Sequence, residues 1–184
     1  MSNQYRKTNN ILGWAMFAIA LVIYVLTLEP TTSWWDCGEY ISTAYKLEVG
    51  HPPGAPLFQM LGRFFSLFAL GNVENVAFMI NMMSAIASAF TIMFLFWTIT
   101  MLGRKIYTPK DNKQRAYGIF AAGIIGALAY TFSESFWFSA VEGEVYGMSS
   151  FFTAITFWAI LKWELVSDTQ YAYRWLILIA YLIG

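Results

Sequence analysis

The sequence predicts an all-α fold, a polytopic bundle of membrane-spanning helices with short interfacial helices in its first outer loop. Hydrophobic residues make up 58% of the 184 residues and charged residues only 12%, whereas an ordinary soluble domain carries about 25% charged residues. Several apolar runs approach the length of about 20 residues with which a helix crosses a bilayer. The lysines and arginines gather between alternate runs, which is the pattern of a membrane protein with a fixed orientation.

Four apolar runs are long enough to span a membrane. We expect these spans at about 11–28, 76–102, 117–133 and 145–161. A fifth run, 173–184, offers only about 12 residues, or about 18 Å of helix. Because a helix does not end in mid-bilayer with a free carboxylate, we expect the sequence to be the N-terminal part of a longer protein. The first run follows Arg6 and Lys7 without a small-residue cleavage site after it, so we interpret it as an uncleaved signal anchor.

The charge pattern sets the expected orientation. With the N-terminus in the cytoplasm, nine of the eleven lysines and arginines fall on the inside, in residues 1–10, 103–116 and 162–174. This agrees with the positive-inside rule, and eight of the eleven acidic residues then fall outside. We therefore predict an integral membrane protein with its N-terminus in the cytoplasm and its acidic face on the non-cytoplasmic side, which in a bacterial inner membrane is the periplasm. The net charge is zero and no basic face forms, so nucleic acid is not an expected partner.

The first outer loop, residues 29–75, opens with EPTTSWWDCGEY, and long loops of this kind are usually functional. Trp34 and Trp35 are expected at the headgroup level. Asp36 and Glu39 are three residues apart, so on a helix they share one face. Crowding and desolvation would raise their pKa values toward that of a general base. The alternative is that Asp36 only caps the helix that it begins, which does not require Glu39.

The helix that follows is expected to end at Gly50, because Ile41, Ala44, Tyr45 and Leu47 have helical spacing and glycine is a common C-cap. The sequence HPPGAP then breaks the helix.

The only histidine, His51, stands at that break, in the same predicted compartment as Asp36. It would serve either as a structural hydrogen-bonding residue or as a functional group. The only cysteine, Cys37, is expected to be a small buried residue, because no thiol-activating motif surrounds it.

Segment 55–71 is expected to be an interfacial amphipathic helix rather than a span. Gln59 and Arg63 lie on one face near its middle, and an arginine within the bilayer costs at least about 2.5 kcal/mol. The apolar residues on the opposite face are expected to be Phe58, Leu61, Phe65 and Phe68. An interfacial helix would keep Arg63 near water, where it is a candidate contact for a lipid phosphate.

A second outer loop, SESFWFSAVEGEVYGMSS, carries another acidic pair. Glu142 and Glu144 flank Gly143, where the backbone is free to turn tightly or to approach a ligand. Tyr146 follows directly. The pair could hold a divalent metal ion, bind a cationic or hydroxylated substrate, or neutralise basic groups elsewhere. No metal-ligand spacing is present, so we name no metal ligand.

Together the two loops resemble a known superfamily. A first span, a long outer loop opening with WWDCGEY, and the stretch HPPGAPLFQMLGRFFSLF before a second span are similar to the GT-C membrane glycosyltransferases. The segments WWDCGEYISTAYKLEVGHPPGAPLFQMLGR and FWFSAVEGEVYGMSSFF most resemble a bacterial multi-spanning family of unknown function that is related to a eukaryotic transmembrane O-mannosyltransferase. The resemblance covers about residues 10–165.

The resemblance implies transfer of a sugar from a polyprenyl-phosphate-linked donor in the membrane to a protein or lipid acceptor on the outer face. It implies that Asp36 orients or deprotonates the acceptor. Family members usually carry Asp-Glu or a single Asp at this place, whereas this chain has Asp-Cys-Gly-Glu, with Glu39 as the second candidate catalytic residue. The candidate substrate-binding residues are His51, Arg63, Glu142, Glu144 and Tyr146. No cofactor other than the lipid-linked sugar is assigned, and a divalent metal ion is left open.

Two other classes of protein fit the composition. A transporter or channel would use acidic residues near a membrane mouth to attract cations. Here the carboxylates lie in loops, the spans carry no central ionisable residue, and no inverted repeat is present. The other class is a non-catalytic membrane scaffold.

Overall fold

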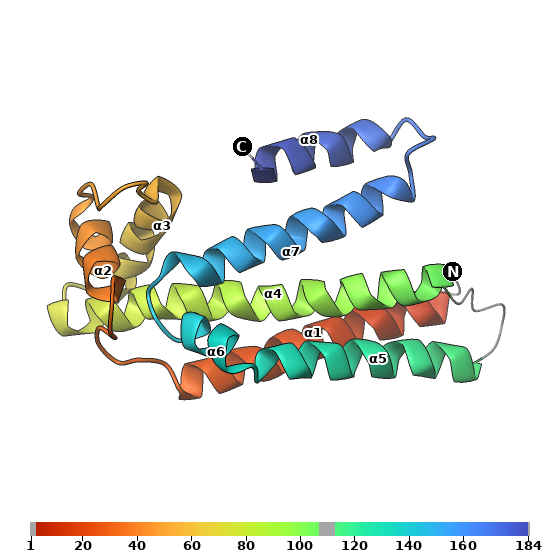
Figure 1. Cartoon of the computed structure of the whole chain (residues 1–184), viewed down its shortest axis with the longest axis horizontal. Coiled ribbons are helices and arrows are strands. Elements are labelled where there is room, and N and C mark those ends of the chain that lie inside the picture. The colour runs from red at the N-terminus through yellow and green to blue at the C-terminus, as the bar shows by residue number, and fades with distance from the viewer. Residues whose placement is uncertain (1–2, 107–112, 184) are drawn as a thin grey trace. The chain divides into compact units, whose positions relative to one another are not determined.

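The computed structural model of the chain describes residues 3–106 and 113–183, and within them it is helical without a strand (Figure 1). The prediction of an all-α fold is confirmed. The elements in order are α1 (Asn3–Leu26), α2 (Cys37–Lys46), α3 (Pro56–Ser66), η1 (Leu67–Ala69), η2 (Val73–Asn75), α4 (Val76–Ile106), α5 (Lys113–Thr131), α6 (Glu134–Ala140), α7 (Val145–Glu164) and α8 (Ala172–Ile183). Part of the predicted inner loop 103–116 lies outside the described residues.

The long helices indicate an integral membrane protein. Among the described residues, helix α1 and the continuous segment Val73–Ile106 are long and apolar enough to cross a membrane. Helices α5 and α6 satisfy the same requirement only as a pair, bent by 69° between them, and α8 is a shorter apolar helix. The described residues thus hold two candidate spans, or three with the bent pair. The further crossings expected at 145–161 and 173–184 coincide with α7 and α8 and stay predictions, as does the orientation.

The helices extend beyond the predicted spans. Helix α1 begins at Asn3, ahead of the apolar run, and α4 continues to Ile106. Arg104 and Lys105 occupy the last turn of α4, where cations interact favourably with the helix dipole. Hydropathy marks the part of a helix that suits lipid, whereas the backbone hydrogen bonds continue into the polar flanks.

By its internal contacts the chain forms two compact units. One consists of Met1–Ala18, Phe90–Thr131 and Ser150–Gly184, and the other of Ile19–Ala89 and Phe132–Ser149. In the first unit, Gly13 permits a close approach of helices, because a Cβ there would lie 2.1 Å from Nε1 of Trp97. Trp97 donates from that nitrogen to the backbone oxygen of Asn9, at 3.3 Å. The second unit contains every predicted site residue.

Within the second unit, helix α6 occupies part of the second outer loop, where the sequence analysis named no helix. Ser133 precedes α6, which buries Phe136 against the ring of Tyr24 at 6.2 Å between centroids. Trp137 donates from Nε1 to the hydroxyl of Thr27, at 2.9 Å. These contacts attach the loop to the end of α1.

Helices α2 and α3 pack side by side as a hairpin (Figure 1). A Cβ on Gly62 would lie 2.9 Å from the Cβ of Ala44, so glycine allows the two helices to approach closely. Helix α2 ends earlier than expected, at Lys46, because Leu47 takes the left-handed conformation with φ 55°. The expectation of a C-cap at Gly50 is therefore wrong.

The amphipathic character of segment 55–71 is present, but its apolar face is rotated. Phe58 is buried against Tyr40 of α2 rather than exposed. The exposed apolar side chains of α3 and η1 are Leu57, Met60, Phe64, Leu67 and Phe68. This row has the spacing of one helix face, as an interfacial helix requires.

Candidate functional site

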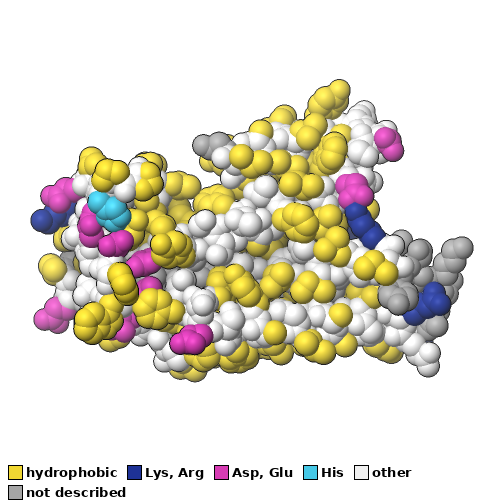
Figure 2. All heavy atoms as spheres, viewed as in Figure 1, with side chains coloured by type: hydrophobic (Ala, Val, Ile, Leu, Met, Phe, Trp, Pro, Cys, Tyr) yellow, Lys and Arg dark blue, Asp and Glu magenta, His cyan; other side chains and the backbone are white. Residues whose placement is uncertain are grey.

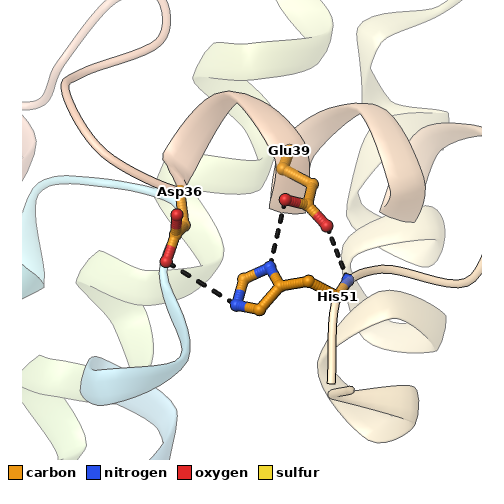
Figure 3. Close-up of side chains that lie close together, drawn as sticks. All are labelled: Asp36, Glu39 and His51. Carbon is orange, nitrogen blue, oxygen red and sulfur yellow. Dashed lines mark hydrogen bonds and ion pairs between the residues drawn. The ribbon is translucent and has the colours of Figure 1, made fainter. Parts of the chain in front are cut away.

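Three predicted site residues meet at the start of helix α2 (Figure 3). The ring of His51 lies between two carboxylates: Nδ1 is 3.0 Å from Oε2 of Glu39, and Nε2 is 3.7 Å from Oδ2 of Asp36. The backbone N–H of His51 also donates to Oε1 of Glu39, at 2.7 Å. In Figure 2 the same histidine is at the surface with acidic side chains around it. These three groups form the Asp36–Glu39–His51 cluster.

The α2–α3 hairpin brings the cluster together. Asp36 is the N-cap of α2, yet its side chain makes no capping hydrogen bond. The alternative in which Asp36 only caps the helix therefore lacks the bond that would give it a structural role. The chain returns past Gly50 to His51, and a Cβ on Gly50 would lie 3.1 Å from Oε1 of Glu39. A glycine here lets the backbone reach the carboxylate.

The contacts within the cluster favour opposite charges on Glu39 and His51. Hydrogen bonds from His51, first from its backbone N–H and then from its ring, hold the pKa of Glu39 below its usual value. The hydrogen bond to Glu39, and then its negative charge, raise the pKa of His51. Crowding and desolvation were expected to raise the pKa of Glu39. That expectation is wrong, because this carboxylate is part-exposed and faces hydrogen-bond donors.

The cluster is also the one group of three or more potential metal ligands found in residues 3–106 and 113–183. One ligand atom from each residue lies within 4.8 Å of the others. Two carboxylates and a neutral imidazole suit a transition-metal ion such as Mn²⁺ or Zn²⁺. The geometry permits such an ion without requiring it, since exposed acidic groups also cluster without metal.

Glu142 and Glu144, the acidic pair of the second outer loop, are buried. Glu142 is 1% exposed and accepts a hydrogen bond from the hydroxyl of Ser33. Desolvation raises the pKa of Glu142, although that hydrogen bond opposes the rise. Glu144 is 6% exposed. Desolvation, and then the charges of Glu142 and Asp36, raise the pKa of Glu144 to about 7. A carboxyl group with this pKa can donate or accept a hydrogen bond near neutral pH.

Tyr40 of α2 is affected by charges from both outer loops, although we did not predict it as a site residue. Desolvation raises the pKa of Tyr40, and the charges of Asp36, Glu144, Tyr146 and Glu39 raise it further. Charged groups of both outer loops thus act on Tyr40, and the hydrogen bond from Ser33 to Glu142 joins the two loops. The position of Tyr40 four residues after Asp36 is the signal that could have identified it.

Arg63 of α3 contacts the end of α2 that is opposite Asp36. Its Nη1 donates to the backbone oxygen of Tyr45, at 2.9 Å, and its guanidinium lies over the Tyr45 ring. Tyr45 belongs to the last turn of α2, whereas Asp36 precedes the first. Arg63 is thus part of the hairpin's packing, and its predicted contact with a lipid phosphate stays a prediction.

Asn81 was also missed by the sequence analysis. It is a fully buried amide of α4 within the predicted span 76–102, and a polar side chain in an apolar span is itself a signal of a specific role. It donates to the backbone of the segment before Asp36, at the oxygens of Glu29 and Thr31.

Comparison with known proteins agrees with the resemblance in the motifs. The family described as Protein O-mannosyl-transferase TMEM260 N-terminal domain matches residues 36–184. The chain is 32% identical over 140 residues to Protein O-mannosyl-transferase tmem260 of Dictyostelium discoideum, covering 76% of the chain and 15% of that protein. It is 29% identical over 151 residues to Protein O-mannosyl-transferase TMEM260 of Mus musculus, covering 82% of the chain and 19% of that protein.

The chain thus spans less than a fifth of the length of these relatives. No solved structure matches it. The match over residues 36–184 begins at Asp36, and it contains the second outer-loop motif and all of the first except Trp34 and Trp35. The chain therefore belongs to the family of the Protein O-mannosyl-transferase TMEM260 N-terminal domain.

Proposed function

We propose that the full-length protein carrying this sequence is a membrane glycosyltransferase. It transfers a sugar from a polyprenyl-phosphate-linked donor to a hydroxyl of a protein or lipid acceptor, on the non-cytoplasmic face. The names of the two relatives support sugar transfer to protein. The observation that carries the proposal is the carboxylate of Asp36, which is 57% exposed, makes no capping hydrogen bond and lies beside the His51 ring.

In the proposed reaction Asp36 is the general base. Its carboxylate takes the proton of the acceptor hydroxyl as the acceptor oxygen bonds to the anomeric carbon of the sugar. The bond from that carbon to the phosphate oxygen breaks, and the lipid phosphate leaves with the electron pair. A base of this kind contributes about 10² to 10⁴ in rate.

Glu39 and His51 support the departing phosphate in this proposal. Glu39 binds both the backbone and the ring of His51, which fixes the ring and favours its protonated form. A cationic imidazole next to Asp36 would attract the phosphate and stabilise the charge that develops on it. A metal ion held by the same cluster would supply this charge instead, with His51 neutral.

The second outer loop would bind the sugar. Glu144 and Glu142 are buried carboxyl groups, and the pKa of about 7 at Glu144 lets it act as donor or acceptor. Tyr40 and the exposed Tyr146 would add hydroxyl groups from the two outer loops. Hydroxyl and carboxyl groups together complement the hydroxyls of a sugar.

The membrane would deliver the donor. The exposed apolar row on α3 and η1 suits the boundary of the lipid, and the hairpin that carries it also carries His51. We propose that Arg63 attracts the lipid phosphate with the part of its guanidinium not bonded to Tyr45.

The test is an assay of the full-length protein in lipid vesicles. Labelled polyprenyl-phosphate sugars and a hydroxyl-bearing peptide or lipid are added, and labelled product is separated by chromatography. Nucleotide sugars serve as the control donors. We expect product with the lipid-linked donors and none with the nucleotide sugars. Product from nucleotide sugars only would contradict the donor assignment, and label that enters the vesicles without a new glycosidic bond would favour the transporter.

A further inference from the structure

The segment that leads to Asp36 has no regular structure of its own. Residues 29–35 form neither helix nor strand, so the backbone groups of this segment need partners from other elements. Asn81 of α4 supplies two of them: its Nδ2 donates to the oxygen of Glu29 at 2.7 Å and to the oxygen of Thr31 at 2.8 Å. Asn81 is 0% exposed. Because Nδ2 donates to two carbonyl oxygens, the orientation of the amide is fixed.

The second outer loop holds the same segment. The backbone N–H of Glu29 donates to the oxygen of Val141, at 3.1 Å, and the hydroxyl of Ser33 donates to Glu142. Every second residue from Glu29 to Ser33 is thus bonded to another element. Position 35, the last before Asp36, has φ 62° although it is a tryptophan. A left-handed residue of this kind persists where its surroundings over-determine the backbone.

The loop also packs closely on Asn81. A Cβ on Gly143 would lie 2.9 Å from Oδ1 of Asn81, so a glycine at this place lets the loop pass the amide. That oxygen has no hydrogen-bond partner of its own. A buried amide with an unpaired oxygen is unfavourable. The gain from Asn81 therefore lies in its two N–H contacts with the segment before Asp36.

We propose that Asn81 is a positioning residue, whose buried amide fixes segment 29–35 and thereby the place of the Asp36 carboxylate beside His51. The inference rests on the proposed function, because it assigns Asn81 a role in the reaction of Asp36. The hydrogen bonds of Asn81 go to Glu29 and Thr31, so we assign it no direct part in the chemistry. A displacement of about 1 Å at a reacting group can cost about 10²-fold in rate. Loss of the two hydrogen bonds from Asn81 would therefore lower kcat more than it raises KM.

The experiment compares two variants on one face of α4 in the full-length protein. Asn81→Ala removes the amide without adding a charge to an apolar helix. Ser84→Ala is the matched control, since Ser84 is 1% exposed, lies one turn further along α4, and its hydroxyl has no partner. Asn81→Asp keeps the size of the side chain and loses the N–H donors. If the added charge prevents folding, Asn81→Ala decides the test.

Each variant is examined in two ways. The first is the vesicle assay, which gives kcat and KM separately. The second is the rate at which a maleimide labels Cys37, resolved by peptide mass spectrometry. Cys37 follows Asp36 directly, is 0% exposed and is a free thiol, so its labelling reports whether the start of α2 keeps its place.

We expect Asn81→Ala to lower kcat by about 10- to 100-fold, with KM changed by less than about threefold, and to speed Cys37 labelling by at least about tenfold. Ser84→Ala should match the wild-type protein in both. The proposal would be overturned if Asn81→Ala had the kcat and the Cys37 labelling rate of the wild-type protein. It would also be overturned if Ser84→Ala lost as much kcat as Asn81→Ala. If the wild-type protein transfers no sugar, the proposed function fails, and the labelling comparison still decides whether Asn81 holds Asp36 in place.

Discussion

At the scale of single residues, hydrogen bonding and burial shift the pKa values of Glu39 and Glu144 in opposite directions. Glu39 is part-exposed and accepts two hydrogen bonds from His51, so the pKa of Glu39 is lowered. Glu144 is buried near two other carboxylates, so its pKa is raised to about 7. One loop thus provides a fixed negative charge, and the other provides a group that gains or loses a proton near neutral pH.

Glu144 should make the stability of the protein depend on pH. Its pKa is raised from the usual 4.5 to about 7, so between these values the native state holds a proton that the unfolded chain has lost. The free energy of unfolding then falls as the pH rises through this window, by roughly 3 kcal/mol in all. Glu144→Gln should remove this part of the pH dependence and be more stable than wild type at pH of about 8.

Thermal unfolding in detergent between pH of about 5 and 8 measures this prediction. The exposed Glu74→Gln is the control and should follow the wild-type curve. A Glu144→Gln curve parallel to wild type across the range would show that Glu144 keeps an ordinary pKa.

Sequence reasoning identified the residues of the cluster but not their protonation. The spacing of Asp36 and Glu39 gave a shared face, and the HPPGAP turn indicated that His51 faces the same side. Whether a carboxylate meets a donor or another carboxylate depends on the turn that returns His51 to Glu39. The contact that this turn makes joins positions 12 residues apart, and helix periodicity does not predict such a contact.

At the scale of elements, the α2–α3 hairpin determines where His51 lies. The two helices approach at Gly62 and Ala44, and Arg63 bonds the last turn of α2. The turn between the helices then places His51 over Glu39. A change that separates the helices should therefore reach the cluster.

Gly62→Ala should separate them. The new Cβ would lie 2.9 Å from the Cβ of Ala44, which is closer than side-chain carbons pack, and overpacking of this kind costs about 1 to 3 kcal/mol. We expect a lower midpoint of thermal unfolding and lower activity. Gly118→Ala is the matched control, because Gly118 is also within a helix and nothing lies within 4 Å of its added Cβ. It should be neutral or stabilise slightly. Equal effects of the two substitutions would contradict the role of the close contact.

The sequence located most helices and misjudged some of their ends. Long apolar runs identify α1, α4, α5 and α7, because the apolar pattern extends over many turns. Helix α6 has only seven residues, too few for a periodic pattern to stand out. The end of α2 was misjudged because Leu47 adopts a left-handed conformation, which at helix ends is usually taken by glycine.

At the scale of the whole molecule, function depends on which side of the membrane the cluster faces. The proposed donor and acceptor are expected on the non-cytoplasmic side, and the lysine and arginine distribution predicts that the loop 29–75 lies there. A reporter that is active only outside the cytoplasm should be on when fused after Gly71. It should be off when fused after Lys110, a position outside the described residues. The reverse pattern would contradict the orientation and the site built on it.

Composition was sufficient to predict a membrane protein, because 12% charged residues cannot cover a soluble surface. The number of crossings is harder to derive. The bend of 69° between α5 and α6 divides an apolar stretch into two helices. Hydropathy along the sequence does not show where a helix axis changes direction. The family, in contrast, was recognisable from two motifs, of which the first lies within the second unit and the second lies there up to Ser149.

The most direct test of the account is the activity of Asp36→Asn in the full-length protein, beside Glu39→Gln. Asparagine keeps the size of aspartate, and Asp36 makes no capping hydrogen bond that could be lost, so the free energy of unfolding should change by less than about 1 kcal/mol. It cannot accept the acceptor's proton, so kcat should fall by at least about 10²-fold, and Glu39→Gln should lose less. Unchanged activity in Asp36→Asn, with normal expression and membrane insertion, would contradict the claim that this carboxylate is the base of a glycosyl transfer.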